Sequence, residues 1–237
     1  MAQFPSDTTA DGVWTLKQQR RAVLGDDWPE VVIPPSDNSV TFDGAGDYLK
    51  TNSSSDFAFG TGDFTMEAWV YGTVGGTQGI VSTRIDAGGG TGQIFFGLSG
   101  TSVLYYAGLA ISGGTVTEDT WHHIACSRSG STVRVFLDGT QVGTGTDSNT
   151  KSTTLGYIGA GGGDGSQLYT GTISNARFVK GTAIYTSSFT VPTSNLTAVT
   201  NTVLLTCQED FLFTDNSGTS KTITTNGDPA ASALSPF

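Results

Sequence analysis

Short β-strand patterns separated by turn residues most constrain what this chain can fold into. From Ser39 to about residue 207, runs of alternating apolar and polar residues are bounded by Gly, Ser, Asp or Thr. The run "DFTMEAWVYG" places Phe64, Met66, Ala68 and Val70 on one side and Thr65, Glu67, Trp69 and Tyr71 on the other. A period of two is typical of a half-buried strand, and many such strands in close succession predict an all-β, two-sheet antiparallel sandwich.

A tight turn and the overall composition support this prediction. In "FLDGTQV", Asp138 and Gly139 tolerate the positive φ angles of a two-residue hairpin turn. The chain has 33 glycines among 237 residues and only 14% charged residues, a composition that does not favour long solvated helices.

Charge and hydropathy exclude several classes of protein. The formal net charge of -10 argues against nucleic-acid binding, which needs a basic face. No window approaches the roughly 18 apolar residues of a membrane span, so we expect no membrane insertion. The first residues, "MAQFPSDTTADGVW", lack the basic and apolar regions of a secretory signal, which predicts synthesis in the cytoplasm. Cys126 and Cys207 are then expected to be buried thiols.

Three segments differ in pattern. Residues 1–38 form an N-terminal arm and linker, in which Asp11 and Gly25 are placed to begin and end a short helix. Residues 39–207 form the sandwich domain, and residues 208–237 form a C-terminal extension with the pattern of one further strand in "KTITTNG". The arm is too short for a core of its own, so its large apolar residues predict a particle-anchoring interface. These residues are Trp14, Leu16 and Trp28.

Five sequence blocks resemble a known fold family. "VTFDGAGDYL", "DFTMEAWVY", "TWHHIACSRSGSTVRVFLDGTQVG", "LGYIGAG" and "YTGTISNARFVKGTAIY" occur in the order seen in laminin-G-like, concanavalin A-like jelly-roll domains. The resemblance covers roughly residues 39 to 190 and implies a jelly-roll sandwich. Lectins, glycan hydrolases, receptor modules and viral surface proteins all use this fold, so the resemblance does not identify one function.

The closing segment narrows the resemblance. "GTISNARFVKGTAIYTSSFTVPTSNLTAVTNTVLLTC" is similar to the end of jelly-roll domains in virion proteins of tailed phages, and "ADGVWTLKQQRRAVLGDDWPE" is similar to short segments of such proteins. The resemblance implies a virion structural protein, either a head-surface decoration or a tail or fibre component. Its partners would be other virion proteins, and assembly into a homo-oligomer stays open. We expect the Ser, Thr and Pro residues after Lys180 to form an extended strap across the sandwich.

The candidate catalytic residues lack the partners that catalysis needs. Some jelly-roll glycanases carry a catalytic carboxylate where this chain has Glu67, but they need a second carboxylate nearby. The neighbours on the same strand face are Thr65 and Trp69. His122 and His123 are adjacent, so in a strand they face opposite sides and cannot act on one centre. The sequence therefore predicts a protein that is not an enzyme.

Calcium is the cofactor that the resemblance brings into question. Related domains often bind Ca²⁺ with an acid in the "FDGxxDY" turn and acids in the closing strand. This chain keeps Asp43 and Asp47 but has Ser174 and Asn175 at the later positions. The resemblance implies Asp47 and Asn175 as ligands if calcium is bound, although hard cations favour carboxylates. The alternative is that the two aspartates only shape turns.

A second function also remains open. A carbohydrate-binding module would use loop aromatic rings to stack on sugars, and a virion jelly roll can itself contact host surface glycans. The candidate glycan-contacting residues are Tyr105, Tyr106, Tyr157 and Tyr169.

Overall fold

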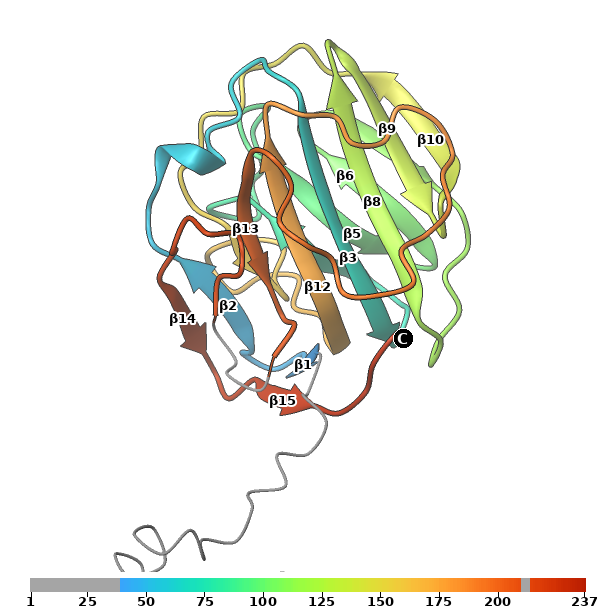
Figure 1. The fold of residues 1–237 in the computed structure, drawn as a ribbon, viewed down its shortest axis with the longest axis vertical. Coiled ribbons are helices and arrows are strands. Elements are labelled where there is room, and N and C mark those ends of the chain that lie inside the picture. Colours follow the sequence, from blue (N-terminus) through green and yellow to red (C-terminus); the bar gives the residue numbers. More distant parts are fainter. Residues whose placement is uncertain (1–38, 210–213) are drawn as a thin grey trace, which may run out of the picture. The chain divides into compact units, whose positions relative to one another are not determined.

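The structure, a computed structural model, describes residues 39–209 and 214–237. These residues form two antiparallel β-sheets packed face to face (Figure 1). A 3₁₀ turn, η1 (Ser55–Phe57), is the one helical element among the described residues. The predicted all-β, two-sheet jelly-roll architecture is confirmed.

The larger sheet contains eight strands. They are β1 (Ser39–Asp43), β3 (Phe64–Gly72), β8 (His122–Ser129), β9 (Thr132–Leu137), β10 (Thr140–Thr146), β12 (Thr170–Lys180), β13 (Thr202–Thr206) and β15 (Ala230–Ser232). Their order is β10-β9-β8-β3-β12-β1-β15, and β13 also pairs with β12. This sheet faces the viewer in Figure 1.

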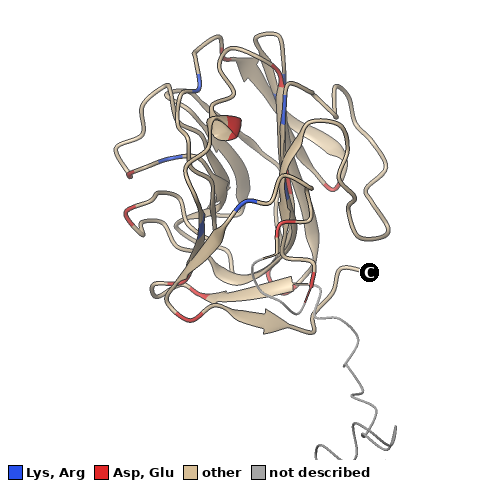
Figure 2. Ribbon diagram, turned by 60° about the vertical axis from the view of Figure 1, so that its left-hand side comes forward, with Lys and Arg blue, Asp and Glu red and all other residues tan. Residues whose placement is uncertain are grey.

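The second sheet contains seven strands and lies behind the first. They are β2 (Tyr48–Thr51), β4 (Thr77–Ser82), β5 (Phe95–Ser99), β6 (Ser102–Tyr106), β7 (Ala110–Gly113), β11 (Tyr157–Ile158) and β14 (Ile223–Asn226). Their order is β14-β2-β11-β4-β5-β6-β7. Figure 2 shows the two layers from the side, with few charged residues along either of them.

The main core lies between the sheets, as the alternation in β3 predicts. The core side of β3 carries Phe64, Met66, Ala68 and Val70, all within the buried apolar cluster. Phe178 of β12 is fully buried and meets the ring of Phe57 edge to face at 5.6 Å between centroids. The other side of β3, with Glu67 and Trp69, therefore faces away from the main core.

The predicted hairpin turn joins β9 to β10. Asp138 and Gly139 have φ angles of 49° and 75°, as a type I′ turn requires. A Cβ atom at position 139 would collide with the carbonyl oxygen of Phe189, so glycine is also needed for the close approach of a distant segment.

The C-terminal extension contributes to both sheets. β14 pairs with β2 in the seven-stranded sheet, and β15 pairs with β1 in the eight-stranded sheet. The sequence pattern predicted one further strand here, and the structure has two. The second is only three small or polar residues long, "AAS", which is too short to show alternation.

A bulge in β12 divides this long strand into two pairing regions. The register with β3 shifts between Ser174, which is opposite Trp69, and Arg177, which is opposite Glu67. Asn175 within the bulge has a φ angle of 55°. The part of β12 before the bulge pairs with β1, and the part after it pairs with β13. The bulge therefore marks the point where one edge of β12 changes its partner strand.

The expectation for the two cysteines is confirmed. Cys126 and Cys207 are buried free thiols, and burial raises the pKa of both groups. The described part of the chain contains no helix with the length and apolar character needed to cross a membrane.

Candidate functional site

The outer face of the eight-stranded sheet is crossed by residues 181–201, which we call the strap. The strap leaves the end of β12, runs in front of β3 and β8, and returns to β13 (Figure 1). It has no regular secondary structure. The strap thus covers the side of β3 that carries Glu67, and the predicted crossing of the sandwich is observed.

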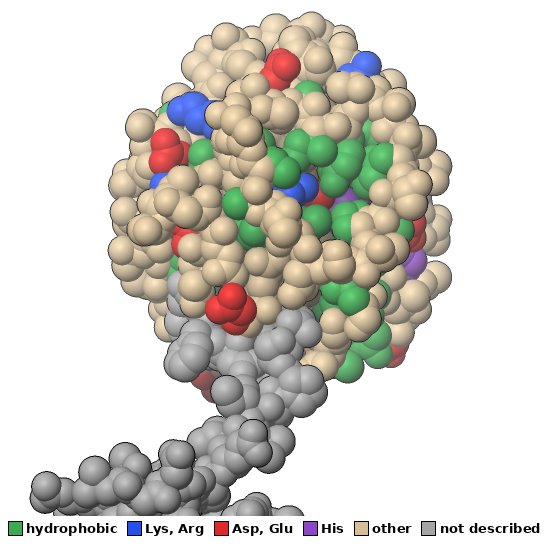
Figure 3. All heavy atoms as spheres, viewed as in Figure 1, with side chains coloured by type: hydrophobic (Ala, Val, Ile, Leu, Met, Phe, Trp, Pro, Cys, Tyr) green, Lys and Arg blue, Asp and Glu red, His purple; other side chains and the backbone are tan. Residues whose placement is uncertain are grey.

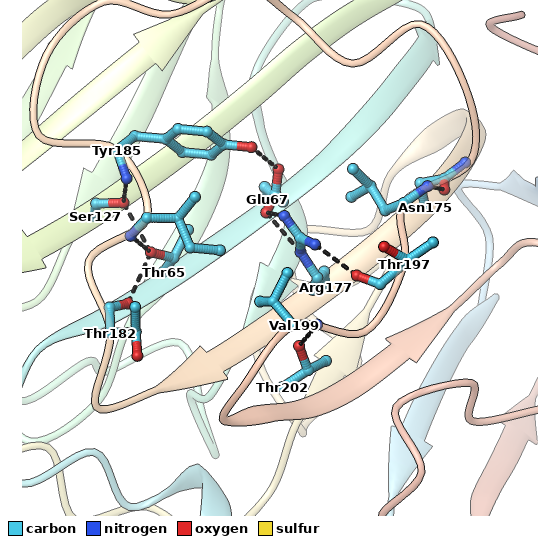
Figure 4. Close-up of polar contacts among 12 residues, drawn as sticks. Thr65, Glu67, Ser127, Asn175, Arg177, Thr182, Tyr185, Thr197, Val199 and Thr202 are labelled. Carbon is cyan, nitrogen blue, oxygen red and sulfur yellow. Dashed lines mark hydrogen bonds and ion pairs between the residues drawn. The ribbon is translucent and has the colours of Figure 1, made fainter.

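Glu67 is fully buried beneath the strap and has three side-chain partners. Its Oε1 accepts hydrogen bonds from Arg177 Nε at 2.8 Å and Nη2 at 2.6 Å. Its Oε2 accepts one from the hydroxyl of Tyr185 at 2.8 Å and lies 3.0 Å from His123 Nε2. Figure 4 shows Tyr185 of the strap and Arg177 of β12 reaching Glu67 from opposite sides.

These partners keep the carboxyl group charged in spite of its burial. Burial by itself would raise the pKa of Glu67, but the hydrogen bond from His123 and the charge of Arg177 outweigh it and leave the pKa below its ordinary value. A carboxylate whose lone pairs are all engaged in this way is a poor general acid, because a general acid needs a raised pKa.

The same site lacks the second carboxylate of a glycosidase. On the outer face, Thr65 and Trp69 flank Glu67 along β3, while Arg177 and Ala125 lie opposite it on the neighbouring strands. None of these four residues is an acid. The arrangement holds the strap in place, and it does not supply the acid and the nucleophile or base that glycoside hydrolysis requires.

Further hydrogen bonds fix the strap at both ends. Near its start, the Thr65 hydroxyl donates to the Thr182 carbonyl at 3.0 Å and accepts from the Ile184 amide at 2.9 Å. Near its end, the Thr197 carbonyl accepts from Arg177 Nη1 at 2.8 Å, as Figure 4 shows. Arg177 therefore links Glu67 to the strap backbone as well.

The two histidines face opposite sides of β8, as predicted. His122 Nδ1 lies 2.7 Å from the Asp138 carboxylate, and its Nε2 lies 2.9 Å from the Thr117 hydroxyl. His123 instead belongs to the Glu67 cluster. They do not meet at one centre.

The structure corrects the calcium ligands implied by the resemblance. Asp47 and Asn175 are not brought together. The Asp47 carboxylate accepts a hydrogen bond from the Asp43 amide, and Asp43 is opposite Thr170 of β12. Asn175 lies five residues further along β12, about 16 Å from Thr170. Asn175 Oδ1 instead accepts hydrogen bonds from the Leu196 amide at 2.7 Å and from Gln208 Nε2 at 2.5 Å. Asn175 is thus a residue that holds the end of the strap.

A different set of residues could hold a cation. Asp43, Asp47 and Asp228 each place a carboxylate oxygen within 4.8 Å of the others. Asp47 is buried, and its two oxygens accept hydrogen bonds from the backbone amides of Asp43 and Asp228 at 3.1 and 2.8 Å. Three carboxylates are a donor set that suits Ca²⁺. Sequence reasoning missed Asp228 because it lies about 180 residues from Asp47 in the extension.

Three of the four proposed glycan-contacting tyrosines are buried, which contradicts that prediction. Tyr105, Tyr157 and Tyr169 are 0%, 2% and 1% exposed, so their rings cannot stack on a sugar. Tyr105 and Tyr169 belong to the main apolar core, and Tyr157 is a buried residue of β11. Tyr106 is partly exposed and stays a prediction. The anchoring residues Trp14, Leu16 and Trp28 lie outside the described residues.

The two packed antiparallel sheets form a concanavalin A-like β-sandwich. Residues 43–184 match the laminin G model of the concanavalin A-like lectin/glucanases superfamily. The matched region is more than half of the chain, and the chain belongs to this superfamily. No curated protein matches its sequence.

Solved structures with a similar chain fold are also found. A candidate carbohydrate binding protein from Bacteroides ovatus is similar to this chain, with a TM-score of 0.60 and 14% identity over 83% of this chain and 60% of that protein. This chain therefore spans less than two thirds of that relative. Domains LG4-5 of mouse laminin alpha1 give a TM-score of 0.48 at 13% identity, covering 68% of this chain and 48% of that one. At 14% identity, the likeness to the Bacteroides ovatus protein establishes the fold alone.

Proposed function

We propose that this chain is a non-catalytic structural protein of a tailed-phage particle, either a head-surface decoration or a tail or fibre component. The resemblance of the closing segment and of the N-terminal segment to virion proteins supports the particle assignment. In this proposal the sandwich is displayed, and residues 1–38 join it to other virion proteins after synthesis in the host cytoplasm.

The arrangement around Glu67 carries the non-catalytic part of the proposal. Glu67 is fully buried, is bound by Arg177, His123 and Tyr185, and has no second carboxylate at the paired positions of the neighbouring strands in the described part of the chain. A sandwich with this face closed can serve as a rigid displayed body. The strap closes the domain in place of forming an open substrate groove.

Mass spectrometry of purified particles tests the assignment directly. We expect the chain to be present at a fixed copy number, and that number separates a head decoration from a tail or fibre component. A variant lacking residues 1–30 should fold as a soluble sandwich and be missing from the particles. Its incorporation at the full copy number would show that the arm is not the anchor, and absence of the intact chain from particles would reject the virion assignment.

An activity assay tests the other half of the proposal. We expect no hydrolysis of β-glucans or of host surface polysaccharide by the purified chain. Hydrolysis that disappears in the Glu67→Gln variant, with the fold retained by circular dichroism, would overturn the non-catalytic assignment.

A carbohydrate-binding module is a second candidate function, favoured by aromatic residues at one end of the outer face. The rings of Tyr71 and Trp121 are partly exposed and lie 5.6 Å apart. On the same face, Phe237 meets Trp69 edge to face at 5.6 Å. Aromatic rings combined with a few polar groups are typical of ligand sites. The two candidate functions are compatible, because a virion protein can contact host surface glycans.

A glycan-binding screen tests this second candidate. We expect Trp121→Ala to weaken binding of any glycan found and Tyr106→Ala, on the other sheet, to leave it unchanged. The opposite result would move the site to Tyr106.

A further inference from the structure

Two buried ring nitrogens on the outer face of the eight-stranded sheet have no hydrogen-bond partner among residues 39–209 and 214–237. They are Trp69 Nε1 and His123 Nδ1. The two residues are directly opposite each other on β3 and β8, and their ring centroids are 5.3 Å apart. Trp69 is 7% exposed and His123 is fully buried. Buried polar atoms in native proteins nearly always have a partner, so two orphan atoms on neighbouring rings point to a group that binds there.

The chemistry of the two nitrogens specifies that group. An indole N–H can only donate a hydrogen bond. His123 Nε2 lies 3.0 Å from the ionised Glu67 carboxylate, so this nitrogen carries the proton and donates it. In the neutral imidazole, Nδ1 is then an acceptor. The site therefore needs an acceptor at Trp69 and a donor at His123, and a hydroxyl group can serve as either.

The surroundings of Trp69 favour a ligand with both hydroxyls and an apolar ring face. Phe237 meets Trp69 with the ring planes at 83° and is itself 44% exposed. Residues 233–237 belong to no strand, and the Phe237 amide donates a local hydrogen bond to the Ser235 hydroxyl at 3.3 Å. Figure 3 shows apolar side chains gathered over this face, with basic, acidic and histidine atoms visible among them.

We infer that the Trp69–His123 pair is a binding site for a pyranose ring, which takes the place of Phe237 and donates and accepts hydrogen bonds through its hydroxyls. This inference rests on the second candidate function, glycan binding, and assigns it to particular atoms. Phe237 then covers the site when no sugar is bound.

The indole N–H signals of the ¹⁵N-labelled full chain test this site. Trp69→Phe keeps an aromatic ring, removes the N–H and identifies the Trp69 signal. The probes are methyl α-D-glucopyranoside, methyl β-D-galactopyranoside and methyl N-acetyl-β-D-glucosaminide, with glycerol as a free polyol. We expect a saturable shift of the Trp69 signal with at least one glycoside and no saturable shift with glycerol. Calorimetry should show about tenfold weaker binding of that glycoside to Trp69→Phe, the equivalent of one lost hydrogen bond.

Two further variants keep the test decisive. Phe237→Ala should bind the same glycoside more tightly than the parent chain, because the cover is removed. Tyr48→Phe, in β2 of the other sheet, should bind it unchanged. Equal shifts with glycerol and glycosides would overturn the inference, as would an ordered water at Trp69 Nε1 in a crystal structure with no response to any glycoside. Glycoside binding that persists in Trp69→Phe would also overturn it while leaving the glycan-binding function standing. Absence of all glycan binding would reject both and leave the virion proposal untouched.

Discussion

Glu67 and Asp147 are both buried carboxylates that accept a hydrogen bond from a tyrosine and pair with a basic residue, yet they join different parts of the chain. The basic partner of Asp147 is Lys151, only four residues away, with 2.7 Å between Oδ2 and Nζ. The basic partner of Glu67 is Arg177, 110 residues away in the sequence. The Asp147 pair therefore belongs to one loop, whereas the Glu67 pair joins two strands of a sheet.

The tyrosine partners differ in the same way. Tyr105, which donates to Asp147 at 2.6 Å, is a fully buried core residue of β6. Tyr185, which donates to Glu67, is a partly exposed residue of the strap. The Asp147 cluster thus fixes a loop against a core that already exists, and the Glu67 cluster is complete only when the strap has docked. This difference leads us to expect the larger loss of stability at Glu67.

The largest expected effect is that of Glu67→Gln. The substitution leaves Arg177 buried without a counter-charge, which typically costs about 3–5 kcal/mol out of a total stability of roughly 5–15 kcal/mol. Urea unfolding measures the loss. The double variant Glu67→Gln/Arg177→Met removes the uncompensated charge as well and should lose less than Glu67→Gln alone. The single variant Arg177→Met completes the comparison. If the loss of stability in the double variant equals the sum of the losses in Glu67→Gln and Arg177→Met, the two side chains are not coupled.

The pH dependence of stability in the parent chain and in Glu67→Gln gives a second check. Because the pKa of Glu67 is lowered in the folded state, its contribution to stability is present above the ordinary glutamate pKa and is lost as the pH falls through the folded value. The stability difference between the parent chain and Glu67→Gln should therefore shrink below about pH 4.3. A constant difference down to pH 2 would contradict this explanation.

Lys151→Met should have the next largest effect. The variant leaves the buried Asp147 without its basic partner, but Tyr105 and the Asn149 amide still donate to it, and the positive charge of Arg128 is close enough to act on Asp147. We expect a loss of about 1.5–3 kcal/mol, the value for a hydrogen bond to a charged group. Lys180→Met is the matched control and should change stability by no more than about 0.5 kcal/mol. A loss larger than that of Glu67→Gln would reverse the comparison.

The sequence predicted the fold where local pattern determines it. The alternation in β3 assigned Met66 to the core side and Glu67 to the other, and Asp138-Gly139 predicted the turn. The bulge at Asn175 was beyond prediction because nothing in "ISNARF" shows where β12 changes partner from β1 to β13. Strand β15 is held by pairing with β1 and not by its own apolar side chains.

The candidate site was predicted only in part, for a related reason. The sequence showed that Glu67 lacks a second carboxylate, and that a strap follows Lys180. It could not show that Tyr185 reaches Glu67, because a segment without regular structure has no period from which to infer direction. Neither Tyr157 nor Tyr169 lies in a run long enough to show alternation, so the sequence could not show that both rings are buried.

The tyrosine hydroxyls permit a sharper comparison, because the same atom can be removed from each cluster. Tyr105→Phe leaves Asp147 without that donor where water cannot replace it, at about 1–2 kcal/mol. Tyr185→Phe should cost less, about 0.5–1 kcal/mol, because Tyr185 is partly exposed and water can reach its position. Thermal unfolding of both variants checks the ranking. Hydrogen exchange should speed up at the Ile184 and Tyr185 amides only in Tyr185→Phe. Equal exchange rates in both variants would show that the hydrogen bond from Tyr185 to Glu67 does not hold the strap in place.

The smallest expected effect concerns Asp43, Asp47 and Asp228, a carboxylate group that differs from the other two in its partners. Among the described residues none of the three forms an ion pair with a basic side chain, so a bound cation is what would offset their mutual repulsion. With a dissociation constant near 1 mM, 1 mM CaCl₂ would stabilise the chain by only about 0.4 kcal/mol.

Asp228→Asn separates the two explanations for this group. If calcium binds, the parent chain gains thermal stability with CaCl₂ and Asp228→Asn does not, whereas Asn175→Ala keeps the response because Asn175 lies elsewhere. If the three aspartates only shape turns, Asp228→Asn is slightly more stable than the parent chain at every calcium concentration, because one repelling charge is gone. Since NaCl at matched ionic strength screens that repulsion without binding, a response that NaCl reproduces in the parent chain would identify screening and exclude a calcium site.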